Sequence, residues 1–274
     1  ALDYAKLHVE KFPQSKVLVI ASDIAKYGIG TPGEPTQGAG SVAMLISQNP
    51  RILAFNDDNV AQTRDVMDFW RPNYATTPFV NGLYSTQQYL DSLKTTWAEY
   101  QKRTGLNLRD FAAVCFHLPY PKLALKGLKK ILDKSLSEDQ KAQLQYNFDQ
   151  SILYSQRIGN IYTASLFLGL LSLLENQPQL KAGDRIALFS YGSGAVAEIF
   201  SANLVPGYEQ MLVSKRMEKL DQRTVLSVED YERLFYEEVD LDPNGNQVFE
   251  PTAHQTYALT EIKEHQRIYQ KVEK

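Results

Sequence analysis

The sequence contains several short runs of apolar, often β-branched residues that show no polar alternation. The clearest of these runs span residues 16–22, 41–47, 52–56, 112–116 and 185–191. A strand with one solvated face alternates apolar and polar residues, whereas a strand covered on both faces is apolar throughout. The runs therefore predict buried strands with helices packed on both faces of their sheets, which is the layered mixed α/β class.

Segments with helical character lie between these runs. We expect helices at residues 1–11, 86–104, 137–158 and 160–176, a further strand at 195–204, and a helix that begins after an N-cap at Ser227. The segment 160–176 is apolar on nearly all sides, so it should be central and buried. Its apolar part is shorter than the roughly 20 residues that span a bilayer. Residues 57–85 are irregular and aromatic, which is typical of long loops that carry function.

Charge and cysteine content exclude some classes of function. The 274 residues carry a net charge of -3 and no block of basic residues, so nothing favours a nucleic-acid partner. The single cysteine, Cys115, excludes an internal disulfide bond and fits the reducing cytoplasm. Because its neighbours are apolar, we expect it to be a small buried hydrophobic side chain rather than a nucleophile.

Residues 113–126 have the strongest chemical content. They are expected to form a buried strand that delivers His117 to a turn, followed by a helix that carries Lys122 and Lys126 one turn apart. A histidine fixed at a strand end can give or take a proton near physiological pH. Two lysines on one helix face suit a phosphate-bearing ligand. From spacing alone, a structural histidine and a solvated helix face remain open alternatives.

Two further motifs fail the test of their context. Residues 28–33 match the pattern G-x-G-x-x-G, but five residues separate them from the preceding strand and no helix start follows, so we reject a dinucleotide site. Residues 240–245 resemble the start of an EF-hand loop, but its twelfth position is Pro251 instead of glutamate. A hairpin turn at Asn244 and Gly245 is the better interpretation, and we predict no metal site.

Six segments in chain order together resemble the hydroxymethylglutaryl-CoA synthase family in its bacterial form. They span residues 16–27, 34–43, 68–72, 115–120, 159–163 and 189–194. The resemblance implies a thiolase-like α/β fold of five layers, α/β/α/β/α, with two similar halves in a homodimer. It implies that residues 1–104 are the remainder of an incomplete N-terminal half with its insertion. Residues 105–274 would be the C-terminal half with a C-terminal extension.

The resemblance also implies a reaction. Acetyl-CoA acylates an enzyme cysteine, the acetyl methyl group is deprotonated, and the carbanion attacks the ketone of acetoacetyl-CoA. Hydrolysis then releases 3-hydroxy-3-methylglutaryl-CoA for the mevalonate pathway of isoprenoid biosynthesis in the cytoplasm. The partners that this implies are the two CoA thioester substrates and a second copy of the chain, with no cofactor and no membrane.

The resemblance assigns roles to individual residues. His117 matches the catalytic histidine, an acid or hydrogen-bond donor at the ketone oxygen, where alkoxide charge develops. Asn160 matches a residue that hydrogen-bonds the acyl group, and its alternative role is the N-cap of the buried helix. Ser193 matches a substrate-facing loop in which Gly192 and Gly194 let backbone N–H groups approach an oxyanion. A plain turn between two strands is the alternative for this loop.

Six further residues match binding or supporting positions: Lys122 and Lys126 match CoA-binding lysines, Thr36 and Ser85 match substrate-contacting hydroxyls, and Asp23 and Asp68 match acidic residues that support the active site. Loop capping is the alternative role for the two hydroxyls. Asp23 is expected to follow directly after a buried strand, where a carboxylate needs hydrogen bonds.

In the family, the nucleophilic cysteine and the glutamate base precede the strand that begins here at Lys16, and Cys115 does not match that nucleophile. We therefore expect this chain to be inactive alone. We also expect an N-terminal segment to accompany it as a separate or cleaved piece, because the first two strands would otherwise have an unpaired edge. The alternatives are a non-catalytic CoA-binding subunit or fragment, and another thiolase-type condensing enzyme such as a ketoacyl synthase.

Overall fold

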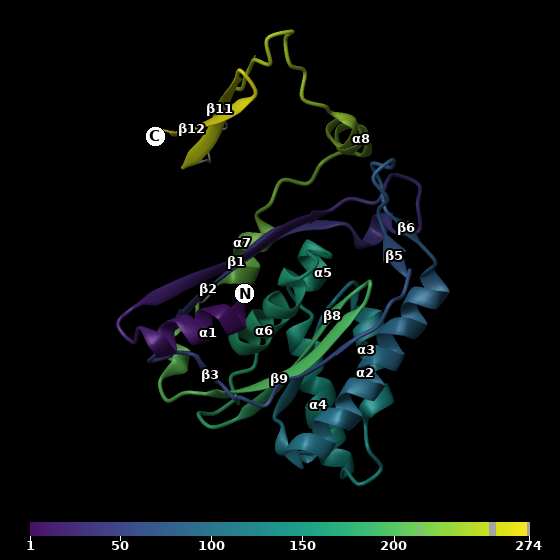
Figure 1. Cartoon of the computed structure of the whole chain (residues 1–274), viewed down its shortest axis with the longest axis vertical. Helices are drawn as coiled ribbons and strands as arrows, with labels where there is room; N and C mark the ends of the chain where they lie inside the picture. The colour runs from purple at the N-terminus through teal and green to yellow at the C-terminus, as the bar shows by residue number, and fades with distance from the viewer. Residues whose placement is uncertain (214, 252–255, 273–274) are drawn as a thin grey trace. The chain divides into compact units, whose positions relative to one another are not determined.

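The computed structural model describes residues 1–213, 215–251 and 256–272 (Figure 1). The chain forms two compact units, Ala1–Gln222 and Arg223–Lys274, which we describe separately. The predicted division into two similar halves at residues 104 and 105 is a different kind of boundary and stays a prediction. Among the described helices, none combines the length and the apolar composition needed to cross a membrane.

A five-stranded mixed sheet lies at the centre of the larger unit. Its strand order is β3-β9-β8-β7, with β4 also paired to β9. β7 runs parallel to β8, with Cys115 opposite Leu188, and the remaining pairs are antiparallel. The strands are β3 (Leu53–Phe55), β4 (Val60–Thr63), β7 (Ala113–Phe116), β8 (Arg185–Gly192) and β9 (Val196–Leu204). The strands predicted at residues 52–56, 112–116, 185–191 and 195–204 are thus confirmed, whereas the short β4 lies in a segment that was predicted to be irregular.

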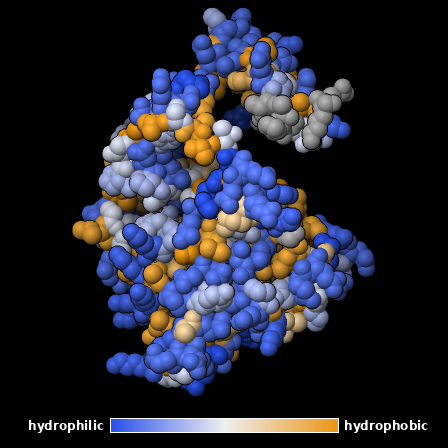
Figure 2. Space-filling view, turned by 180° about the vertical axis from the view of Figure 1, so that it is seen from behind, coloured by the Kyte–Doolittle hydropathy of each residue, from blue (hydrophilic) through white to orange (hydrophobic). Residues whose placement is uncertain are grey.

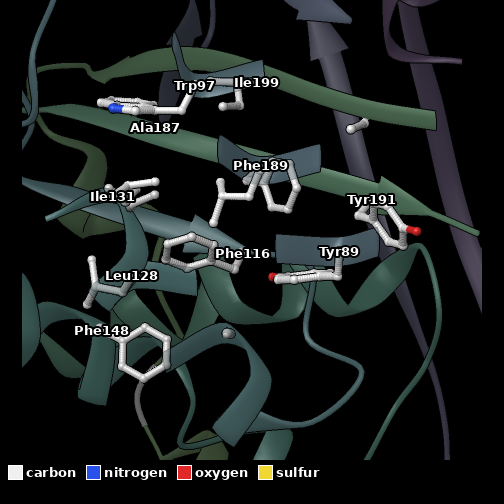
Figure 3. Packing of buried hydrophobic residues seen from close by; sticks show 14 of the residues in the cluster. Tyr89, Trp97, Phe116, Leu128, Ile131, Phe148, Ala187, Phe189, Tyr191 and Ile199 are labelled. Atoms are coloured by element: carbon white, nitrogen blue, oxygen red, sulfur yellow. The ribbon is translucent and has the colours of Figure 1, made fainter. Parts of the chain in front are cut away.

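Helices cover both faces of this sheet, as its apolar runs predicted. On one face, side chains of α2 (Gly82–Thr104), α3 (Pro121–Ile131) and α4 (Glu138–Ser151) pack against Phe116 and Phe189 (Figure 3). On the other face, α6 (Ala164–Asn176) packs against Cys115 and Leu188. Neighbouring residues of a strand point to opposite faces, so Phe116 and Cys115 belong to different clusters. Cys115 is buried, as the sequence predicted.

A long antiparallel pair, β1 (Lys16–Ala25) and β2 (Gly38–Ser47), forms a separate two-stranded sheet. The prediction that these strands are covered on both faces is wrong for the described residues. Ala21 and Val42 pack against the cluster around α6, but Leu18 and Ile20 on the other face are 57% and 59% exposed. Apolar side chains are exposed elsewhere on the surface too (Figure 2). The two apolar runs therefore predicted the strands correctly, but they did not predict that one face of this sheet is exposed.

The other elements of this unit are short or peripheral. They are α1 (Leu2–Lys11), β5 (Phe69–Trp70) paired with β6 (Phe79–Val80), α5 (Ser155–Ile158) and α7 (Arg216–Asp221). The helix predicted at residues 137–158 is confirmed but interrupted, since α4 ends at Ser151 and α5 begins at Ser155. α2 begins four residues earlier than predicted, because the side chain of Asn81 accepts a hydrogen bond from the N–H of Tyr84 and caps the helix there.

The smaller unit contains α8 (Val228–Tyr236) and a three-stranded antiparallel sheet of β10 (Gln247–Val248), β11 (Tyr257–Lys263) and β12 (Gln266–Lys271). The predicted N-cap is confirmed, because Ser227 Oγ accepts a hydrogen bond from the N–H of Asp230. The turn at Asn244 and Gly245 is confirmed as well, with Gly245 at φ 77°. It does not close a hairpin, since β10, which follows the turn, pairs with β11.

Burial in the cluster beneath α2 sets the stability of the larger unit. Leu93 lies in the middle of α2 and has no exposed surface, whereas Leu83 near its start is 88% exposed. We expect Leu93→Ala to lower the free energy of unfolding by about 2–5 kcal/mol, because it removes buried methyl groups and leaves a cavity. The matched change Leu83→Ala should alter it by about 0.5 kcal/mol or less. Urea denaturation of both variants tests this, and equal losses would contradict it.

Candidate active site

The end of β7 holds His117 through its backbone. The N–H of His117 donates to the carbonyl of Phe189 on β8 at 2.7 Å, which continues the parallel pairing by one residue. Its carbonyl accepts a hydrogen bond from the hydroxyl of Tyr89 on α2 at 3.0 Å. The predicted strand that delivers this histidine to a turn is therefore confirmed, and the turn leads into α3.

The imidazole of His117 is buried, with 9% of the residue exposed. Burial lowers its pKa to about 4, although a hydrogen bond from the ring to the backbone carbonyl of Tyr162 opposes this shift. The ring is therefore neutral at pH 7. A neutral imidazole carries one N–H and one lone pair, so the hydrogen bond to Tyr162 uses the N–H and leaves the other nitrogen as an acceptor.

Asn160 lies in the link between α5 and α6, and every polar group of its side chain is bonded. Its Nδ2 donates to the hydroxyl of Tyr27 at 2.8 Å. Its Oδ1 accepts from the N–H of Tyr162 at 2.9 Å and from Ser165 Oγ at 3.1 Å. The alternative role as N-cap of α6 is wrong, because that helix begins at Ala164 and its N-cap is Thr163.

The loop before β2 meets this link, which brings Thr36 to Asn160. The N–H of Asn160 donates to the carbonyl of Thr36 at 2.9 Å. The hydroxyl of Thr36 donates to the carbonyl of Gly33 at 2.7 Å, which is the loop-capping arrangement that the sequence left open. Thr36 thus contributes its backbone carbonyl to the site, while its hydroxyl forms a hydrogen bond within its own loop.

Asp68 forms a second centre beside the turn between β8 and β9. It is fully buried, and its carboxylate accepts hydrogen bonds from the hydroxyls of Tyr191 and Ser193, both at 2.9 Å. It also accepts from the N–H of Gly194 at 3.3 Å and, more weakly, from the hydroxyl of Ser85 at 3.4 Å. Three predicted site residues, Ser85, Ser193 and Gly194, therefore converge on the carboxylate of a fourth, Asp68. The alternative of a plain turn for Gly192 to Gly194 is incomplete, because Asp68 anchors that turn.

Asp23 does not lie where the sequence placed it. β1 continues past Ser22 to Ala25, so Asp23 is an exposed residue within the strand, opposite Gly40, instead of a buried carboxylate after it. Its Oδ1 accepts a hydrogen bond from the N–H of Ile24. The apolar run ends at Ser22, but backbone pairing with β2 carries the strand beyond the run.

A cavity of about 340 Å³ is lined by the residues that directly follow His117 and directly precede Asn160, while neither of these two residues is itself part of its lining. Its walls come from the loop around Thr36, the segment after His117, and the segment before Asn160; they include Pro35, Gln37, Leu118, Pro121, Arg157 and Gly159. α3 begins at this wall, and Lys122 and Lys126 are exposed on its first two turns. The cavity thus lies next in sequence to both predicted catalytic residues and at the start of the helix that carries the two lysines. His117 and Asn160 are also absent from the lining of a second cavity of about 470 Å³ between α1, β1 and β9.

The protein-family model described as "Hydroxymethylglutaryl-coenzyme A synthase C terminal" matches residues 59–145 and 128–272 of this chain. The chain belongs to the hydroxymethylglutaryl-CoA synthase family. It is 51% identical over 243 residues to the hydroxymethylglutaryl-CoA synthase of Enterococcus faecalis, an alignment that covers 88% of this chain and 63% of that protein. It is 34% identical over 241 residues to a polyketide-biosynthesis 3-hydroxy-3-methylglutaryl-ACP synthase of Bacillus subtilis (strain 168), covering 81% of this chain and 57% of that protein.

Solved structures of hydroxymethylglutaryl-CoA synthases confirm the thiolase-like α/β fold. One, a synthase complexed with CoA, is 66% identical with a TM-score of 0.96, and the match covers 99% of this chain and 70% of that one. The synthase of curacin biosynthesis in complex with an apo donor ACP is 30% identical with a TM-score of 0.87, covering 99% and 70%. The chain thus spans less than two thirds of the curated relatives named above and somewhat more of these solved chains.

Three tyrosines of the site were not predicted from the sequence. The hydroxyl of Tyr27 accepts a hydrogen bond from Asn160, the backbone N–H of Tyr162 donates one to Asn160, and the hydroxyl of Tyr191 donates one to Asp68. Burial raises the pKa of each phenol, so all three are neutral hydrogen-bonding groups. All three lie inside the segments that carry the family resemblance, and that position is the signal that could have found them. In the described residues, no group of three or more His, Cys, Asp or Glu is arranged to hold a metal ion.

The buried, neutral His117 makes a prediction about stability. Its pKa of about 4 lies below the ordinary value of 6.5, so the unfolded chain takes up this proton first as pH falls. Between about pH 7 and pH 5, His117 should therefore lower the free energy of unfolding by about 2 kcal/mol. His117→Gln removes the titrating group and keeps an N–H donor. Urea denaturation at both pH values should show a smaller fall for this variant, and identical falls would refute the assignment.

Proposed function

We propose that the protein that contains this chain condenses acetyl-CoA with acetoacetyl-CoA and water to give 3-hydroxy-3-methylglutaryl-CoA and free CoA. The observation that carries the proposal is the pair of buried groups, His117 and Asn160, next in sequence to the residues that line a cavity at the start of α3, the helix that carries Lys122 and Lys126. Membership of the synthase family supports it. The proposal includes the mevalonate pathway, a cytoplasmic homodimer and no cofactor, as the family resemblance implies.

The first half of the reaction needs a thiolate and a base. A cysteine thiolate attacks the thioester carbonyl of acetyl-CoA, a C–S bond to the enzyme forms, and CoA leaves as the thiol. Cys115 is unfit for this step, because burial raises the pKa of its thiol to about 12 and it lies inside the sheet. The proposal therefore assigns the nucleophile and the glutamate base to residues outside 1–274, as the family resemblance implies.

The second half is the condensation. The deprotonated methyl carbon of the enzyme-bound acetyl group forms a C–C bond to the ketone carbon of acetoacetyl-CoA, and the electron pair of the C=O bond moves onto oxygen. Water then cleaves the thioester to the enzyme and frees the product. A protonated His117 can give its proton to the oxygen. The His117 ring is neutral without substrate. Protonation of the ring therefore requires that the negative charge developing on the substrate oxygen raises the pKa of the imidazole.

Asn160 and the lysines have binding roles in this proposal. The carboxamide of Asn160 offers a donor to the acyl oxygen of the substrate, although in the free protein that donor is bonded to Tyr27. Lys122 and Lys126 attract the phosphate groups of CoA from the exposed face of α3. Because both substrates are CoA thioesters, one cationic edge can serve the two halves of the reaction in turn.

A second candidate function is that of a non-catalytic CoA-binding subunit or fragment. The burial and the raised thiol pKa of Cys115 favour it, because the chain itself offers no thiol that can be acylated. Intact mass of the purified protein under denaturing conditions, after incubation with acetyl-CoA, separates the two candidates. A component that gains one acetyl group supports the synthase. This chain alone, without an acetyl group, supports the CoA-binding subunit or fragment.

Replacement of His117 should separate the two half-reactions. In the intact synthase, we expect His117→Ala to slow condensation by about 10²–10⁴-fold, because general acid catalysis at the ketone oxygen is lost. Acetylation of the enzyme should change far less, since the thiolate and its base lie elsewhere. Rapid-quench measurement of acetyl-enzyme and product gives both rates. His8→Ala, at an exposed histidine of α1, is the matched control. Equal losses in both steps would contradict the role.

Replacement of the lysines should affect binding more than turnover. We expect Lys122→Ala or Lys126→Ala to raise KM for the CoA substrates by roughly tenfold, since a charge-assisted contact to phosphate is lost. Turnover should stay nearly constant, because the phosphates interact equally in the ground state and the transition state. Lys102→Ala, at an exposed lysine of α2, is the control. A fall in kcat at constant KM would count against this role.

A further inference from the structure

Near the end of α6, Glu175 carries a buried carboxylate that the proposed reaction does not use. Only 3% of its side chain is exposed. It accepts two hydrogen bonds from the guanidinium of Arg216 in α7, at 2.9 and 3.1 Å, and one from the N–H of Val213 at 3.3 Å. A fourth comes from the hydroxyl of Tyr154, just before α5, at 2.5 Å. A buried carboxylate needs such partners, and this one joins two other segments to α6.

α7 is held by an ion pair at each end. Its first residue is Arg216, whose two nitrogens contact the two oxygens of Glu175, an arrangement that fixes orientation as well as distance. Its last residue is Asp221, which pairs with Arg157 of α5 at 3.2 Å. The pair at the start is largely buried on the glutamate side, whereas the pair at the end is exposed. α7 is therefore fixed to both α6 and α5.

The segment that α7 contacts contains Asn160. Met217 and Leu220 of α7 pack against the apolar cluster that includes Ile161, the residue directly after Asn160. Tyr154 belongs to the same cluster, and its hydroxyl donates to the carboxylate that binds α7. α7 is thus paired with a residue that precedes Asn160 and packs against the cluster that holds the residue after it.

This segment needs support from outside, because part of its backbone is unfavourable by itself. Tyr162, two residues after Asn160, has φ 47°, in the left-handed region that residues with a Cβ rarely adopt. Such a conformation persists only where the surrounding structure holds it. The N–H of Tyr162 donates to Asn160 Oδ1 at 2.9 Å, so the strained residue and the carboxamide are joined. Loss of the outside support should therefore release both.

We propose that Arg216 is a positioning residue that, through Glu175, holds α7 against residues 154–161 and thereby fixes the Asn160 carboxamide for the substrate. Residues 155–159 of this segment also line the cavity that leads up to Asn160, so the same contact holds that wall. The effect on rate rests on the proposed condensation, whereas the effect on the segment does not. The competing explanation is that the ion pair stabilises α7 alone.

Hydrogen exchange tests the effect on the segment without the reaction. In Arg216→Ala, we expect the amides of residues 158–162 to exchange about tenfold faster than in the wild type, because the segment opens locally. The amides of residues 113–117 should keep their rates. Mass spectrometry of overlapping peptides from the intact protein measures both. A rise confined to residues 216–221, or an equal rise throughout the protein, would overturn the proposal.

Three further variants serve as controls for this test. Arg103→Ala removes an arginine that pairs with Glu99 at 2.8 Å on α2, and it should leave exchange at residues 158–162 unchanged. Arg216→Lys keeps the charge but loses the two-pronged contact, so its exchange rates should be intermediate. Asp221→Asn breaks the exposed pair and should speed the same amides by less. If Arg216→Ala does not fold, unchanged exchange in both of these last variants is the result that refutes the proposal.

The kinetic test uses the intact synthase. We expect Arg216→Ala to slow condensation about tenfold, because a misplaced hydrogen-bond donor loses its alignment with the substrate. Arg216→Lys should restore part of the rate, and Arg103→Ala should stay within about twofold of the wild type.

A double-mutant cycle shows whether Arg216 acts through Asn160. In an Asn160→Ala background, Arg216→Ala should slow condensation by less than about twofold, since the group that it positions is already absent. Losses that multiply fully would show that Arg216 acts elsewhere and would contradict the assignment. A wild-type protein that forms no 3-hydroxy-3-methylglutaryl-CoA refutes the proposed function instead, and the exchange measurement then decides the role of Arg216 by itself.

Discussion

The close crossing of two backbone segments, near Gly38 and near Gly159, is the constraint on which the rest of the site depends. A Cβ on Gly159 would overlap the carbonyl of Gln37, and a Cβ on Gly38 would overlap the carbonyl of Ile158. Gly159 also has φ 84°, which glycine tolerates best. With both side chains absent, the crossing brings the carbonyl of Thr36 to the N–H of Asn160. The hydrogen bonds of Asn160, Tyr27 and Tyr162 all follow from this contact.

Burial gives the site its electrostatic character. His117 is buried just after the end of β7, so its ring loses contact with water and its neutral form is favoured. A buried neutral imidazole needs a partner for its N–H, and the Tyr162 carbonyl meets that need. The same burial makes Asp68 a fixed acceptor at the centre of three hydroxyls and one N–H. Two polar centres are thus fixed by the packing around them.

The sequence predicted the elements of the site better than the contacts between them. The apolar run at residues 112–116 predicts a buried strand, and therefore places His117 at a strand end. The bonds from Asn160 to Tyr27 and from Ser193 to Asp68 join residues that are 133 and 125 positions apart. No local pattern encodes such pairs, so the site residues came from the family resemblance. Asp23 was misplaced because backbone pairing extends β1 beyond its apolar run. The left-handed φ of Tyr162 has no signal in its residue type.

The two titratable groups at the end of β7, Cys115 and His117, show how one environment suits one side chain for proton transfer and makes another unreactive. Low polarity favours the neutral form of both, so it raises the pKa of the thiol to about 12 and lowers that of the imidazole to about 4. A neutral imidazole remains useful, since its free nitrogen can take up a proton and return it. A neutral thiol is a poor nucleophile. A cysteine that is to be acylated needs a cation or a helix N-terminus beside it, and the interior of a sheet offers neither. The environment that keeps His117 neutral is therefore unsuited to a nucleophilic thiol.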